Sequence, residues 1–161
     1  MGEGKENVGC LGFLFRLFQR EGSAPEASRL PTVTVNTRFV TSAEADFFRV
    51  LRATVGDRGH ILAQVSLKQL LYFPGKRDPA RQRWQNKVAQ KSVDFVICDV
   101  ATLKPKLVIE LDEPPHARPA RQTRDDEVET ILEAAGLPVI RVLTSRTYDM
   151  RELEAAVGPH L

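Results

Sequence analysis

The sequence predicts one small α/β domain built on a mixed β-sheet. Its 161 residues include 42% hydrophobic and 27% charged side chains, the usual balance of a single globular core. Two runs rich in Val and Ile, separated by a connection of hairpin length, predict an antiparallel strand pair. A later helical pattern followed by another apolar run predicts a crossover to a parallel strand. The expected order is helix, three strands, helix and strand.

The first helix is predicted by a start signal and an apolar stripe. Thr41 and Glu44 have the spacing of a capping box. The stripe that follows at helical spacing comprises Phe47, Val50, Leu51 and Thr54. Two glycines in 56–59 end the helix, and a strand is predicted over 60–65. Before the helix, the alternating residues 32–36 predict an extended segment.

The middle of the chain predicts a connection followed by the strand pair. Residues 66–69 repeat the capping pattern and predict a helical turn over 67–72. Residues 74–91 are polar and basic, and Pro79 can open a short helix there. The two strands of the pair cover 93–100 and 106–111.

The last third predicts a helix, a strand and a final helix. The long helix runs from about residue 120 to 135 and ends at Gly136. Its core stripe comprises Val128, Ile131, Leu132 and Ala135. A strand at 137–143 and a helix at 149–156 follow.

The N-terminal region is predicted to lie outside the domain. Residues 1–18 form a short apolar or amphipathic segment, 19–31 a flexible linker, and 32–161 the α/β domain. The apolar part, 8–18, is broken by Arg16, too short to span a membrane, and lacks the features of a secretory signal. It is interpreted as a helix that docks on the domain or a partner, with a weak membrane-surface contact as the alternative.

Charge and cysteine content limit the function classes. The net charge of +2 predicts no strong general attraction to polyanions, so any nucleic-acid contact must depend on a local patch. Cys10 and Cys98 fit neither a disulfide framework nor a metal-ligand spacing. Their small number is consistent with a reducing compartment, and we expect a cytoplasmic protein.

Acids within the predicted strand pair are the first candidates for chemistry. Asp94 and Glu110 each interrupt or end an apolar strand, and hairpin pairing would bring their carboxylates together. Two such groups repel unless a cation or proton lies between them. Mg²⁺ takes hard oxygen ligands and supports phosphodiester hydrolysis. Alternatively, acids at strand ends are simply solvated or ion-paired.

The polar connection offers a second candidate, a surface for nucleic acid. Its cations are Lys76, Arg77, Arg81, Arg83, Lys87 and Lys91. Asp78 is the one acid in this stretch, and Trp84 lies among the cations. Such a patch can bind phosphates without reading sequence, although a solvated helix face would look the same. Lys91 is three residues before Asp94 and is a candidate to reach the acidic pair.

Five segments, in this order and spacing, resemble a bacterial family of unknown function. They are Val93-Asp-Phe95, Leu107-Val-Ile-Glu-Leu-Asp112, His116, Arg121-Gln-Thr-Arg-Asp125 and Gly136-Leu-Pro-Val-Ile-Arg141. The family is the domain of unknown function 2726, and the resemblance covers about residues 41–143. More distantly, the segments resemble the very-short-patch-repair nucleases of the PD-(D/E)XK superfamily. The resemblance implies a restriction-endonuclease-like fold, a three-layer core with a small mixed sheet.

This resemblance also implies site residues. Asp94 and Glu110 would be the acidic ligands of Mg²⁺ or Mn²⁺, and Leu111 would offer its backbone carbonyl. Glu44 matches an acid that many such nucleases place near the metal, with the helix cap as the equal alternative. The implied activity is a metal-dependent endonuclease or phosphodiesterase acting on DNA, without a small-molecule cofactor.

The sequence departs from the superfamily pattern at one position. Asp112 stands where a lysine would orient water and neutralise charge in the transition state. Asp112 cannot take that role, but it is a candidate site residue whose carboxylate could bind metal. His116 is a candidate for proton transfer, or a surface side chain in a Pro-rich loop. A phosphate contact or ordinary intrahelical pairs would equally explain Arg121, Gln122 and Arg124. The alternative function is an inactive nuclease-fold module that binds nucleic acid or a protein.

Overall fold

The computed structural model describes residues 31–76, 78–113 and 122–161. Residues 38–161 form a compact unit, and the segment before them is a separate unit. Predictions for 1–18 and for the linker up to residue 30 fall outside the described residues. Residues 32–36 are described and form no strand. In the described part of the chain, no helix is long and apolar enough to cross a membrane.

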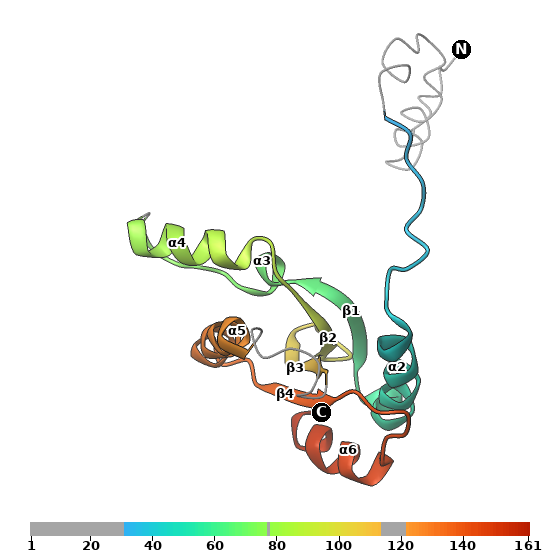
Figure 1. Cartoon of the computed structure of the whole chain (residues 1–161). Coiled ribbons are helices and arrows are strands. Elements are labelled where there is room, and N and C mark those ends of the chain that lie inside the picture. The colour runs from blue at the N-terminus through green and yellow to red at the C-terminus, as the bar shows by residue number, and fades with distance from the viewer. Residues whose placement is uncertain (1–30, 77, 114–121) are drawn as a thin grey trace, which may run out of the picture. The chain divides into compact units, whose positions relative to one another are not determined.

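A four-stranded mixed sheet forms the centre of the unit, in the order β1-β2-β3-β4 (Figure 1). The strands are β1 (His60–Ser66), β2 (Ser92–Cys98), β3 (Pro105–Asp112) and β4 (Val139–Leu143). The first three pair antiparallel, and β4 lies parallel to β3. The predicted hairpin and the predicted parallel crossover are therefore both confirmed. β2 ends at Cys98 rather than at residue 100, because the Asp99 side chain accepts the Ala101 and Thr102 amides and begins the turn.

One face of the sheet is covered by α2 (Ser42–Val55) and α6 (Met150–Val157). Thr41 and Glu44 form the predicted capping box, with amide-to-side-chain distances of 3.2 and 2.9 Å. The buried cluster on this face comprises Phe47, Leu51, Val55, Phe95, Ile97, Leu107, Ile109, Leu153 and Val157. We call it the α2–α6 cluster. Most of the predicted helical stripe is thus in the core.

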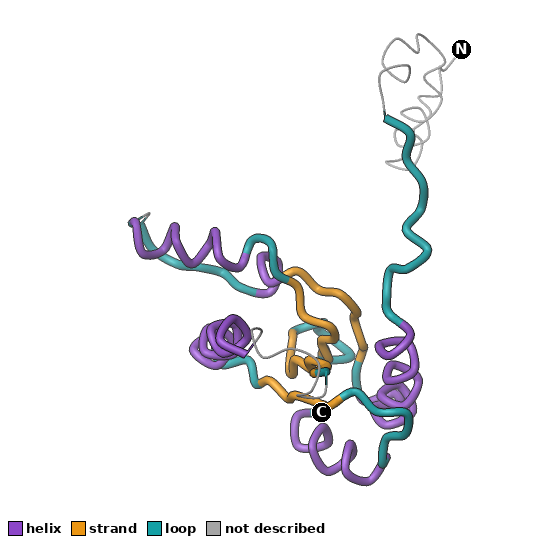
Figure 2. The backbone as a smooth tube through the Cα atoms, viewed as in Figure 1, coloured by secondary structure: helices purple, strands orange, loops and turns teal. Residues whose placement is uncertain are grey.

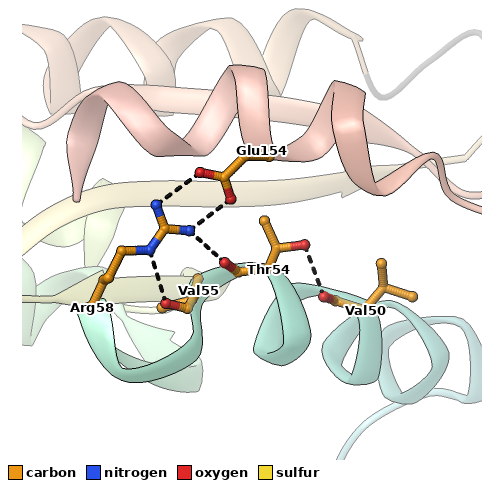
Figure 3. A network of polar contacts seen from close by, with 5 residues as sticks. All are labelled: Val50, Thr54, Val55, Arg58 and Glu154. Carbon is orange, nitrogen blue, oxygen red and sulfur yellow. Dashed lines mark hydrogen bonds and ion pairs between the residues drawn. The ribbon is translucent and has the colours of Figure 1, made fainter.

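The C-terminal end of α2 is also joined to the middle of α6 by a polar contact (Figure 3). The Arg58 guanidinium, in the short 3-10 helix η2 (Gly56–Arg58), donates to both carboxylate oxygens of Glu154 in α6, at 2.6 and 2.8 Å. It also donates to the carbonyls of Thr54 and Val55 in the last turn of α2, at 2.6 and 3.3 Å. One side chain therefore ties the C-terminal end of α2 to α6. The chain ends in a second 3-10 helix, η3 (Gly158–His160).

The opposite face packs against α3 (Leu67–Leu70), the last residue of α4 (Pro79–Val88) and α5 (Gln122–Ala134), while the rest of α4 extends away from the sheet (Figure 1). The buried cluster here, the α5 cluster, comprises Leu67, Val88, Val93, Val96, Cys98, Val108, Leu132 and Leu137. Two faces with separate cores make a layered arrangement of helix, sheet and helix, as expected for an α/β domain.

Two predictions about helix ends in this layer differ in outcome. The predicted cap at Ser66 is wrong: its side chain makes no capping hydrogen bond, and α3 lasts four residues. At the end of α5 the predicted glycine cap is confirmed. Gly136 has φ +74°, and the Leu137 amide donates to the Leu132 carbonyl at 2.9 Å, which reverses the chain into β4.

Candidate functional site

The predicted acidic pair forms across β2 and β3. Phe95 is in register with Ile109, so the neighbouring residues Asp94 and Glu110 lie opposite each other. Their carboxyl groups are close enough that each shifts the pKa of the other. The Leu111 amide donates to Asp94 Oδ2 at 2.8 Å, which fixes the aspartate beside the next strand. The pairing of two strands therefore brings together acids that are 16 residues apart in the sequence.

Burial and mutual repulsion make this pair costly to ionise. Removal from water, followed by the charge of Asp94, raises the pKa of Glu110 to about 8. Burial also raises the pKa of Asp94, against the opposing effect of the Leu111 amide. At neutral pH the pair therefore holds a proton or requires a cation, because two adjacent desolvated carboxylates repel each other.

Glu44 contributes to this electrostatic environment while it caps α2. Its carboxylate accepts the Thr41 amide, as the capping interpretation predicts. Its negative charge also helps to raise the pKa of Asp94. The cap and a place near the acidic pair are thus compatible, and a direct metal contact stays a prediction.

Asp112 is held by an arginine that the sequence patterns did not mark as a site residue. Its carboxylate forms an ion pair with Arg141 at 3.5 Å, and Arg141 Nε donates to Glu129 at 3.0 Å. Arg141 lies in register with Glu110 on the parallel strand β4, and its charge opposes the rise in the pKa of Glu110. The sequence signal for Arg141 was a charged residue in the middle of the apolar run Val139–Leu143. The sequence alone does not show that Arg141 is in register with Glu110, because that register is set by the sheet.

The strand on the other side of the pair is distorted at the same level. Gln64 has φ +54°, a region that non-glycine residues seldom adopt, and the flanking register places it opposite Asp94. Alternate residues of a regular strand share a face. Here Ala63 packs against the α2–α6 cluster, whereas Val65 packs against the α5 cluster. The side chains of β1 thus change face beside the acidic pair, along the curved course of this strand in Figure 2.

The donor set fits a hard divalent cation only in part. In the described residues, no three His, Cys, Asp or Glu side chains are grouped as metal ligands. Two carboxylates remain, Asp94 and Glu110, and Mg²⁺ is commonly bound through one or two carboxylates while it keeps several waters. The predicted contact through the Leu111 carbonyl would add one more oxygen. The pair therefore suits Mg²⁺ better than a metal that requires a complete protein cage.

The predicted basic residues fall mainly on and around α4. Arg81, Arg83 and Lys87 are within this helix, with Lys76 before it and Lys91 just after it. Lys91 lines a hollow together with Trp84. The cation in register with Glu110 is Arg141. Several other predicted site residues cannot be placed. Arg77, His116 and Arg121 lie outside the described residues, and of Gln122 and Arg124 in α5 only the backbone is described.

Comparison with known families shows to which family the chain belongs. Residues 36–160 match the family described as Protein of unknown function (DUF2726). The chain belongs to the DUF2726 family. No curated protein and no solved structure matches it. The DUF2726 region begins just before the cap of α2 and includes every helix and strand named above, with the acidic pair near its centre.

Proposed function

We propose that this DUF2726 domain is a Mg²⁺-dependent phosphodiesterase that cleaves DNA, on a restriction-endonuclease-like fold. The observation that carries the proposal is the desolvated pair of Asp94 and Glu110 on adjacent strands. A half-buried pair of adjacent acids is a costly arrangement, and a bound cation reduces the cost. Mn²⁺ would fit the same oxygen donors. Bound metal would supply an activated water and stabilise charge on the phosphate.

The other groups then take supporting roles. Arg141 brings a fixed positive charge into the neighbourhood that the superfamily gives to a lysine, and it offsets the negative charge of Asp112. Arginine binds phosphate oxygens well, although it stays protonated and cannot act as a base. His116, by resemblance, would transfer the proton.

One observation favours a second candidate, an inactive nuclease-fold module that binds nucleic acid or a protein. Asp112 replaces the usual lysine, and its ion pair with Arg141 engages both side chains. A guanidinium held by two carboxylates has less freedom to contact a substrate. Such a module would have the fold of a nuclease but would not hydrolyse phosphodiester bonds.

Calorimetry tests the metal site directly. Mg²⁺ or Mn²⁺ is titrated into the wild-type chain, Asp94→Asn, Glu110→Gln and the control Glu113→Gln, which changes an exposed carboxylate beyond β3. We expect binding by the wild type and by the control, and loss of binding in both site variants. The measurement is repeated with DNA present, because a phosphate oxygen can complete the coordination.

Nuclease assays on nicked, mismatched and single-stranded DNA then separate the two candidates. Cleavage that requires metal and both acids supports the phosphodiesterase. Metal binding without cleavage of any substrate favours the inactive module. If neither the free protein nor its DNA complex binds metal, the catalytic proposal is wrong.

A further inference from the structure

An arm of 25 residues, 67–91, is inserted between the neighbouring strands β1 and β2. It contains α3, a loop and α4, as Figure 2 shows. At its base the Leu67 amide donates to the Lys91 carbonyl at 2.9 Å, so the arm leaves and rejoins the sheet at one point. Farther out, Arg81 donates to the Gly75 carbonyl, and the Asp78 side chain caps α4 through the Arg81 amide at 2.8 Å. These bonds give the arm a defined shape.

The arm concentrates positive charge in a chain that is nearly neutral. Its described cations are Lys68, Lys76, Arg81, Arg83, Lys87 and Lys91. Asp78 is the one acid among the described residues of the arm, and its carboxylate is engaged at the helix cap. Because the whole chain has a net charge of only +2, this local excess is a candidate surface for a polyanion.

A small, open apolar hollow lies between α4 and α5, beside this charge. Trp84 and Val88 of α4 and Val128 and Ile131 of α5 line it, together with the side chains of Lys87 and Lys91. The Trp84 side chain is 36% exposed, and the Lys87 ammonium is 4.9 Å from the centre of its ring. An accessible ring beside two cations offers both contacts that a nucleotide requires, a flat apolar surface for the base and charge for the phosphate.

We propose that the arm binds single-stranded DNA, with an unpaired base against Trp84 and the adjoining phosphates near Lys87 and Lys91. The choice of DNA rests on the proposed function, whereas the binding itself needs no metal. Base pairs of an intact duplex keep their faces stacked on one another, so a duplex presents mainly phosphates to the hollow. Asp94 follows Lys91 by three residues, so DNA held near Lys91 lies at the start of β2, the strand that carries Asp94.

Tryptophan fluorescence tests this proposal, because Trp84 is the sole tryptophan of the sequence. An oligo-dT of about 12 nucleotides, within the range that one single-strand-binding domain covers, is titrated into the full chain in EDTA. We expect saturable quenching of the Trp84 emission by oligo-dT and a much smaller change with a duplex of equal length. An oligo-U of equal length serves as the RNA arm of the experiment.

Variants separate stacking from charge, with binding measured by the anisotropy of a labelled oligo-dT. Trp84→Leu should weaken binding about tenfold. Lys87→Gln and Lys91→Gln should each weaken binding and reduce the dependence of affinity on salt by about 0.7 in the logarithmic slope. The matched control is Lys104→Gln, which removes an exposed cation from the turn at the far end of β2 and should leave affinity unchanged.

Three results would overturn the proposal: no quenching, equal affinity of Trp84→Leu and wild type, or tighter binding of duplex than of single strands. Tighter binding of oligo-U than of oligo-dT would contradict the assignment to DNA. Unchanged circular dichroism of each variant establishes that its fold is retained. The fluorescence titration is carried out in EDTA, so it reports DNA binding by the arm without metal. If the arm binds oligo-dT but calorimetry detects no metal binding at Asp94, the proposed catalysis is wrong and the proposed DNA binding stands.

Discussion

At the scale of single residues, the acidic pair shows how burial changes the chemistry of an ordinary side chain. The carboxyl groups of Asp94 and Glu110 lie opposite each other in a partly desolvated position, and both have raised pKa values. Arg141 opposes the rise in the pKa of Glu110 but is itself shared with Asp112 and Glu129. The local charge balance therefore leaves the pair short of positive charge, which is the condition that favours a bound cation.

The raised pKa of Glu110 predicts how the stability of the metal-free protein depends on pH. Its pKa is about 8 in the folded chain, above the ordinary value of 4.5, so folding favours the protonated form. That contribution is complete below about pH 4.5 and is lost as the pH rises through about 8. In denaturant titrations in EDTA, Glu110→Gln should remove a decline on the order of a few kcal/mol across this window.

The control Glu113→Gln should retain the decline, because its exposed carboxylate is outside the pair. Saturating Mg²⁺ should flatten the decline in the wild type by stabilising the ionised pair. If metal-free stability instead rises steadily from pH 4.5 to 8, the raised pKa is not a property of the folded protein.

At the scale of elements, close backbone approach sets how α2 meets the sheet. Gly59 joins η2 to β1 and has the extended φ of −166°, which any residue can adopt. Space is the constraint here. A Cβ on Gly59 would lie 2.8 Å from Ile97 Cγ2, 3.2 Å from the Cys98 carbonyl oxygen and 3.3 Å from a Val55 methyl group. Helix, turn and strand meet at this point without room for one more carbon.

Gly59→Ala should therefore destabilise the fold through overpacking, by about 1–3 kcal/mol. The comparison is Gly136→Asn, at the left-handed cap that ends α5, with φ +74°, where an added Cβ would meet nothing within 4 Å. Asparagine is the residue other than glycine that most readily takes this cap conformation, so the loss should be smaller. Thermal and denaturant unfolding of both variants measures the difference, and an equal loss at the two positions would argue against the steric account.

At the scale of the whole molecule, the sheet is stabilised by two separate cores, one on each face. The α2–α6 cluster depends on a helix near the end of the chain, and Leu153 and Val157 of α6 complete it. The ion pair of Arg58 and Glu154 joins the same helices but is about half exposed on both sides. Apolar burial is therefore the larger contribution to docking α6, because solvent screens exposed ion pairs.

Two substitutions one residue apart should separate these contributions. Leu153→Ala removes a buried side chain and should cost about 2–5 kcal/mol. Glu154→Gln removes the charge that Arg58 contacts and should cost much less, since water can replace the lost contact. Denaturant unfolding of both variants gives the comparison. A greater loss for Glu154→Gln would mean that the ion pair, and not packing, holds α6 in place.

Local patterns in the sequence determined most of the elements. Helix ends act through neighbouring backbone groups, so the local sequence is enough to identify them. Examples are the capping box at Thr41, Pro79 at the start of α4 and Gly136 after α5. The same reasoning failed at Ser66, where the spacing was present but no capping hydrogen bond formed. Hairpin pairing placed Asp94 against Glu110 in advance, because a short turn leaves little choice of partner strand.

Only the tertiary structure decided what lies around that pair. The register of β4 brings Arg141 beside Glu110 and Asp112, and parallel register depends on how α5 packs rather than on a turn. The face change at Gln64 and the hollow between α4 and α5 likewise need several elements in contact. Contacts between residues a few positions apart can be predicted from the sequence, because they depend on local spacing. The charge and shape of a site depend on distant segments that only packing brings together.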